Sequence, residues 1–167
     1  GCPRGKDAFD VLQEGIRRYV YDSFSGEGHV STSEFRTQGW ITENLVARWR
    51  IEPDAVLKTT WGPKSLPRAI QDVLEDVFVR EAAAGGKGFV FDVEGDGPDT
   101  GRRAPLQHLY FLDPALAAYE EVFKGRDAAY AARLLGLAGR MVDWLSSVTY
   151  GGDTESSGLY RPRQIPY

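Results

Sequence analysis

The stretch Leu45-Val46-Ala47-Arg48-Trp49-Arg50-Ile51 decides the fold that the sequence predicts. Apolar side chains occupy every second position from Leu45 to Ile51, and a period of two is typical of a half-buried strand. Glu52-Pro53-Asp54 follows with turn chemistry. Residues 55–61 then predict a second strand, so the sequence predicts a hairpin from Leu45 to Trp61.

A second hairpin is predicted further along the chain. Gly88 to Glu94 is a short apolar run, which indicates a mostly buried strand. The ten residues from Gly95 to Ala104 are typical of a loop. Pro105 to Leu112 alternates again, with His108 and Tyr110 on one predicted face. We therefore expect two hairpins that together form an antiparallel sheet of 4–5 strands.

Four segments predict helices: Asp7–Asp22, a helix from Ser65 that Gly85 and Gly86 end, Asp113–Phe123 and Asp127–Val148. Pro67 lies in the first turn of the second helix, where a missing N–H costs little. Asp113, followed by Pro114, and Asp127 are expected N-caps. The predicted fold class is α+β: the sheet of two hairpins is packed by N-terminal, central and C-terminal helices.

Residues 28–38 permit two interpretations. His29 to Ser33 is rich in β-branched and small residues, which favours a strand. Ser31 with Glu34 three positions later is also a capping box that would open a short helix. A helix-turn-helix over Ser31 to Arg50, with Gly39 in the turn, is a further alternative. The strand is the preferred interpretation.

The chain of 167 residues suits a single domain over residues 1–167, with a Gly/Ser-rich extended tail from about 149. The net charge of −4 disfavours nucleic acid as the main partner. No apolar run approaches the roughly 20 residues that cross a bilayer. A cytoplasmic location is favoured, and a lipid anchor on Cys2, which follows Gly1, is the alternative.

Four carboxylates, those of Asp92, Glu94, Asp96 and Asp99, cluster in the predicted loop after the strand 88–94. Carboxylate oxygens are the ligands that hard divalent cations select, so the cluster predicts a site for Mg²⁺ or Ca²⁺. It does not match an EF-hand loop, because Arg103 stands at the twelfth place where a Glu is needed. The alternative is a charged loop whose Asp and Gly residues serve turn geometry.

The segment Phe89-Val90-Phe91-Asp92-Val93-Glu94, with Gly95 after it, resembles the first motif of metal-dependent 3′–5′ exonucleases of the proofreading type. The resemblance implies that Asp92 and Glu94 hold two metal ions. It covers about eight residues. The central Asp and the late His-x-x-x-x-Asp of that family have no match, because Asp113 follows His108 by five residues but far too early in the chain.

His29 and His108 are the two histidines of the chain and form a candidate catalytic pair. Imidazole titrates near neutrality, so two histidines can act as acid and base in phosphodiester chemistry. His29 lies in a His-x-Ser motif. His108 does not, because Tyr110 stands where Ser or Thr belongs. The alternative is one exposed loop histidine and one strand histidine that is hydrogen-bonded within the fold.

Aromatic and basic residues interleave around the first predicted hairpin and form a candidate ligand-binding set: Trp40, Arg48, Trp49, Arg50 and Trp61. Trp and Arg are the usual anchors of binding surfaces. The alternative is that the Trp side chains fill the core.

These observations favour a non-enzymatic domain that binds a protein segment or a small molecule through an aromatic sheet face or groove. A homodimer is compatible with the sequence. The predicted element order is similar to that of small acidic secretion chaperones, at the level of fold only. The alternative function is a metal-dependent phosphodiesterase or nuclease centred on Asp92, Glu94 and Asp96, with His108 as its acid or base.

Overall fold

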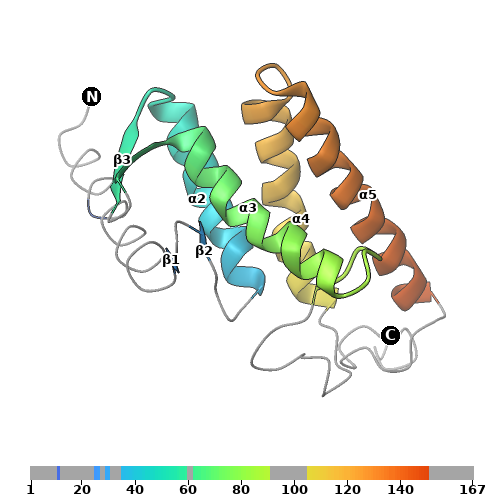
Figure 1. The fold of residues 1–167 in the computed structure, drawn as a ribbon. Coiled ribbons are helices and arrows are strands. Elements are labelled where there is room, and N and C mark those ends of the chain that lie inside the picture. The colour runs from blue at the N-terminus through green and yellow to red at the C-terminus, as the bar shows by residue number, and fades with distance from the viewer. Residues whose placement is uncertain are drawn as a thin grey trace.

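The computed structural model describes residues 11, 25–26, 29–30, 35–59, 62–90 and 105–150, and these residues are mostly helical (Figure 1). Their elements are β1 (Ser25–Gly26), β2 (His29–Val30), α2 (Phe35–Ile51), β3 (Val56–Thr59), β4 (Gly62–Ser65), α3 (Leu66–Ala83), α4 (Pro105–Ala117), the π-helical η2 (Ala118–Phe123) and α5 (Ala128–Tyr150). Within this described part, β1 pairs with β2 and β3 with β4, both antiparallel. The predicted α+β fold with a sheet of 4–5 strands is therefore wrong.

Helix α2 replaces the predicted strand Leu45–Ile51. The seven-residue window is too short to show the helical period: Phe35 and Ile41, upstream of it, are buried on the same helix face as Leu45, and Ile51 is exposed. Gly39 lies inside this continuous helix, so the helix-turn-helix interpretation is wrong as well. The strand interpretation of residues 29–33 is confirmed for His29 and Val30, which form β2, and residues 31–33 lie outside the described residues.

The first hairpin is shifted rather than absent. Glu52-Pro53-Asp54 leaves the helix in a turn, as predicted. The two strands that follow are β3 and β4, with Val56 opposite Ser65 and Thr59 opposite Gly62. The predicted hairpin Leu45–Trp61 is wrong, because its first strand is helical.

Helix α4 replaces the predicted strand Pro105–Leu112 and continues through Pro114. His108, Phe111, Ala115 and Ala118 are buried at intervals of three and four, which is helical spacing. Pro114 was expected to open a helix, but it lies inside one. Since Pro114 has no N–H, the helix cannot make the usual bond to the carbonyl of Tyr110.

The helices after β4 and after η2 confirm the predictions made for them. Ser65 caps α3 by accepting a hydrogen bond from the Arg68 N–H at 3.4 Å, and Gly85 and Gly86 follow its end with positive φ. Asp127 caps α5 by accepting from the Tyr130 N–H at 3.0 Å. Apolar side chains at helical spacing are buried on both helices, among them Ile70, Leu74 and Val77 on α3 and Leu134, Leu137 and Met141 on α5.

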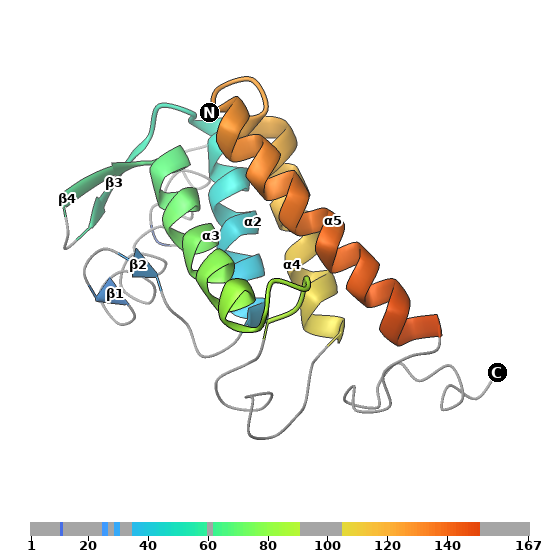
Figure 2. The same cartoon turned by 45° about the vertical axis from the view of Figure 1, so that its right-hand side comes forward.

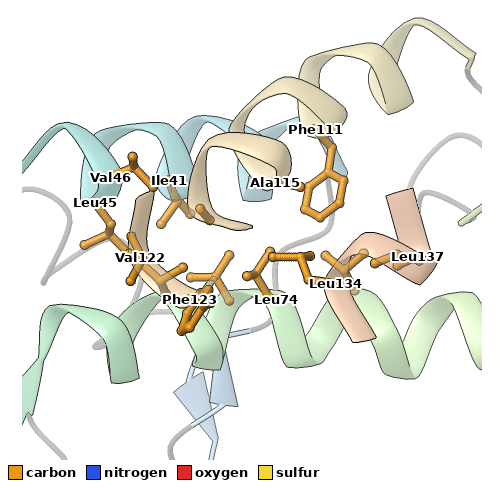
Figure 3. Close-up of a cluster of buried hydrophobic side chains, with 14 of the residues drawn as sticks. Ile41, Leu45, Val46, Leu74, Phe111, Ala115, Val122, Phe123, Leu134 and Leu137 are labelled. Atoms are coloured by element: carbon orange, nitrogen blue, oxygen red, sulfur yellow. The ribbon is translucent and has the colours of Figure 1, made fainter. Parts of the chain in front are cut away.

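The four long helices alternate in direction, and they share one core (Figure 2). α2 packs against α3 and α4, and α4 packs against α5. Figure 3 shows side chains of every helix pointing toward one another: Ile41, Leu45 and Val46 of α2, Leu74 of α3, Phe111 and Ala115 of α4, Val122 and Phe123 of η2, and Leu134 and Leu137 of α5. Burial of these apolar side chains is the main source of stability.

Other predicted segments lie outside the described residues. These are the helix Asp7–Asp22 apart from Val11, the strand Gly88–Glu94 beyond Val90, and the tail after Tyr150. Residues 88–90, which are described, are not part of a strand.

None of the described helices combines the length and the apolar character needed to cross a membrane.

Candidate functional site: an aromatic surface on α2 and α4

Two large aromatic side chains, Trp40 of α2 and Tyr110 of α4, lie next to each other on the outside of the molecule. Their ring centroids are 6.2 Å apart, and the rings are tilted by 53°. Trp40 is 45% exposed and Tyr110 44%. The guanidinium of Arg36, one turn before Trp40, lies 5.5 Å from the Trp40 ring centroid. These three residues are called the aromatic surface.

A close approach of the two helix backbones holds this surface in place. A Cβ atom built on Gly39 would overlap the carbonyl oxygen of Tyr110 and come within 2.9 Å of the Cα of Phe111. Only glycine allows this contact. The carbonyl involved is the one that Pro114 leaves without its usual helical donor. Trp40 and Tyr110 therefore project from adjacent points on two helices in direct backbone contact.

The other described members of the predicted Trp and Arg set are engaged inside the fold. Trp49 is half-buried against the core, and the guanidinium of Arg126 lies 4.7 Å from its ring centroid. Arg48 is buried and forms an ion pair with Glu52. Trp61 lies outside the described residues. Of the predicted aromatic residues that are described, only Trp40 lies on an open surface.

Arg50, the remaining member of that set, joins the end of α2 to η2, the helix that directly follows α4. Its Nε and Nη2 donate to the two carboxylate oxygens of Glu121 at 2.6 and 2.5 Å. This bidentate contact raises the pKa of Arg50 and lowers that of Glu121. The carboxylates of Glu43 and Asp113 also favour the charged form of Arg50, although less strongly. Both therefore lie within electrostatic reach of one guanidinium.

His108 lies in the core. Its side chain is fully buried, with its ring 4.8 Å from that of Phe35 and 4.4 Å from that of Trp144. Its Nε2 accepts a hydrogen bond from the Val90 N–H at 2.9 Å. An accepting nitrogen carries no proton, so this imidazole is held in its neutral form and ties residues 88–90 to α4. These contacts favour the structural alternative for His108.

His29 lies in β2, but its side chain is outside the part of the chain that the structure describes. The pairing of His29 with His108 therefore stays a prediction. The predicted metal ligands Asp92, Glu94, Asp96 and Asp99 also lie outside the described residues. Among the residues that are described, no three His, Cys, Asp or Glu side chains gather where they could hold a metal ion. The Mg²⁺ or Ca²⁺ site stays a prediction.

Tyr110 was not predicted as a surface residue, because residues 105–112 were assigned to a strand. Glu43 and Asp113 were not predicted as members of a binding surface either. A signal for Glu43 was present: Arg36, Trp40 and Glu43 follow one another at spacings of four and three, which places them on one face of a helix. That pattern becomes informative only once residues 35–51 are assigned to a single helix.

Comparison of the chain with known protein families, with curated proteins and with solved structures found no match. The functional argument therefore rests on the residues themselves.

Proposed function

We propose that this protein is a non-enzymatic binding domain that recognises a segment of another protein through the aromatic surface of Arg36, Trp40 and Tyr110. The observation that carries the proposal is the exposure of Trp40 and Tyr110 side by side at a fixed helix crossing. The predicted aromatic sheet face is replaced by this helical surface.

The residue types fit a role in binding. Trp, Tyr and Arg are the residues most enriched among those that carry binding energy at protein interfaces. Trp and Tyr offer large contact areas with only two side-chain torsions, so little conformational entropy is lost when a partner orders them. Leaving nearly half of a Trp and of a Tyr in water forgoes burial free energy that a partner would recover.

The helices that carry Trp40 and Tyr110 are held by two further contacts. An ordered surface of this kind lowers the conformational free-energy cost of binding. Gly39 sets α2 directly against the backbone of α4 at Tyr110. The bidentate pair between Arg50 and Glu121 joins α2 to η2, the continuation of α4, three turns further on. A surface that is already ordered pays less for association than a loop that must first be fixed.

A peptide-display selection tests the proposal. Peptides enriched on the wild-type protein are measured by fluorescence anisotropy against wild type, Trp40→Ala and the control Val79→Ala, which truncates an exposed apolar residue of α3. We expect Trp40→Ala to weaken binding about tenfold or more, the loss that defines an important interface residue. Val79→Ala should leave the affinity unchanged.

Circular dichroism melts of all three proteins verify that the variants remain folded. Failure to enrich any peptide on the wild-type protein would contradict the proposal. So would equal affinities for wild type and for a folded Trp40→Ala variant.

A further inference from the structure

Helices α2 and α4 run parallel in a fixed register. This register determines which side chains of the two helices meet at their interface, the α2–α4 seam. Gly39 meets Tyr110 at one end, and Arg50 meets Glu121 at the other. Partners in both contacts are 71 positions apart in the chain. Figures 1 and 2 both show the two helices side by side and pointing the same way. Residues one turn beyond the aromatic surface on each helix must therefore also be neighbours.

Those residues are Glu43 on α2 and Asp113 on α4, and both are exposed. Each lies three residues after a ring of the aromatic surface, Glu43 after Trp40 and Asp113 after Tyr110, so the same register that brings the two rings together brings these positions together. Arg50 itself is engaged by Glu121. Among the described residues, neither Glu43 nor Asp113 forms an ion pair. Two exposed carboxylates thus face outward together, one turn from Trp40 and Tyr110.

Along α2 the outward-facing groups follow a fixed order. Arg36, Trp40 and Glu43 span seven residues, or about 10 Å of helix at roughly 1.5 Å per residue. Asp113 adds a second negative charge at the Glu43 end. The surface is therefore an aromatic patch with an acidic end formed by two carboxylates.

We infer that this surface binds an amphipathic helix of a partner protein that carries a large apolar residue and, one helical turn away, a Lys or Arg. The apolar residue would lie against Trp40 and Tyr110, and the cation would lie between Glu43 and Asp113. Side chains one turn apart on a helix have the same spacing as these two features. The inference rests on the proposed function, because it names the partner of the same surface.

Charge complementarity favours a basic partner. Two neighbouring carboxylates repel each other, and a cation placed between them relieves that repulsion as it binds. The net charge of −4 acts in the same direction during diffusional approach. An acidic helix would instead bring like charges together at this end of the surface.

A helix-biased display library with a fixed Trp anchor tests the inference. The positions three and four residues on either side of the anchor are randomised. Enrichment is compared on wild type, on Glu43→Lys/Asp113→Lys, and on the control Asp54→Lys/Asp143→Lys, which makes the same change in net charge at two other exposed acids. We expect Lys and Arg to be enriched on wild type and on the control.

On Glu43→Lys/Asp113→Lys the preference should change to Asp and Glu, and the basic peptides should bind about tenfold or more weakly. No preference for Lys or Arg on wild type would overturn the inference. So would a preference that survives the double reversal, or one that the control loses equally.

The two proposals fail in distinguishable ways. If Trp40→Ala abolishes enrichment while Glu43→Lys/Asp113→Lys changes nothing, the binding function stands and the basic partner is excluded. If a folded Trp40→Ala variant enriches the same peptides as wild type, both proposals fall.

Discussion

The seam between α3 and α5 and the seam between α2 and α4 differ in how their charged side chains are paired. Each has a glycine against the backbone of a neighbouring helix. Gly88, just after α3, meets the carbonyl of Arg140 in α5, and Gly39 in α2 meets that of Tyr110 in α4. The difference lies in the side chains around these contacts.

On the α3–α5 seam the charges are engaged across the interface. Glu81, which is buried, accepts hydrogen bonds from Nε and Nη2 of Arg140 at 2.9 and 3.1 Å and from the Gly88 N–H at 2.9 Å. Glu75 pairs with Arg133 at 2.5 Å. Buried charges are tolerated when they are paired in this way. These contacts hold the fold together.

On the α2–α4 seam, the outward side combines exposed aromatic rings with two carboxylates that face solvent. Those groups add little to folding, because exposed rings and charges contribute little to stability. The two regions therefore differ in their charged groups: the α3–α5 seam pairs its charges across the interface, and the α2–α4 seam leaves exposed rings and carboxylates for the partner that we propose.

The largest expected effect is that of Gly88→Ala on the α3–α5 seam. A Cβ there would overlap the Arg140 carbonyl and lie 2.6 Å from the Met141 nitrogen, at a φ of +80°. Overpacking costs about 1–3 kcal/mol, and an unfavourable φ about as much again, so we expect a loss of roughly 3 kcal/mol or more in urea unfolding.

Gly86→Ala is the matched control for that variant. Gly86 has a φ of +68°, and no atom lies within 4 Å of the point that its Cβ would occupy, so only the conformational cost applies. Equal losses for the two variants would mean that the contact with α5 is unimportant.

A smaller effect is expected from Glu81→Gln, about 1–3 kcal/mol, because hydrogen bonds to a charged group contribute more than neutral ones. Burial raises the pKa of Glu81, but the hydrogen bonds from Arg140 and from the Gly88 N–H lower it further, and the net shift is downward. The stabilisation is therefore present above the unfolded value of about 4.3 and is lost as pH falls through the lower folded pKa.

Urea unfolding between about pH 3 and pH 7 measures this effect. Wild type should lose more stability on acidification than Glu81→Gln does. Glu75→Gln, at the more exposed pair with Arg133, should cost less than about 1 kcal/mol. Parallel pH profiles for wild type and Glu81→Gln would contradict the assignment.

Of the three main substitutions, the smallest effect is expected from Gly39→Ala on the α2–α4 seam. Overpacking against the Tyr110 carbonyl costs about 1–3 kcal/mol, and the better helix propensity of Ala returns about 1 kcal/mol, so a net loss near 1 kcal/mol is expected. Gly139→Ala is the control, since Gly139 lies in α5 with open space around it.

Gly139→Ala should be neutral or stabilising in the same unfolding measurement. Gly39→Ala should in addition weaken the peptides selected on the aromatic surface, because it separates Trp40 from Tyr110. A Gly39→Ala variant as stable as Gly139→Ala would show that the helices do not depend on this contact.

The elements that the sequence predicted correctly have local signals at both ends or along a full face. Ser65 and Asp127 cap α3 and α5, and the apolar faces of these helices repeat over four or more turns. α2 and α4 were missed because short windows alternate by chance and because Pro114 suggested a helix start. Trp40 was predicted as a binding residue, but its neighbour Tyr110 comes from residues 105–112, which were misassigned to a strand.

The sequence by itself determined α3, α5 and their buried faces, because caps and periodicity act between residues a few positions apart. Only the tertiary structure decided that residues 35–51 and 105–117 are helices with Gly39 against Tyr110, because that contact joins segments 71 positions apart. Packing between elements also decided which of the described Trp and Arg residues face solvent: Trp40 is exposed, whereas Trp49 packs against the core and Arg48 is buried. The exposure of a side chain depends on what packs against its helix, and a local sequence pattern does not contain that information.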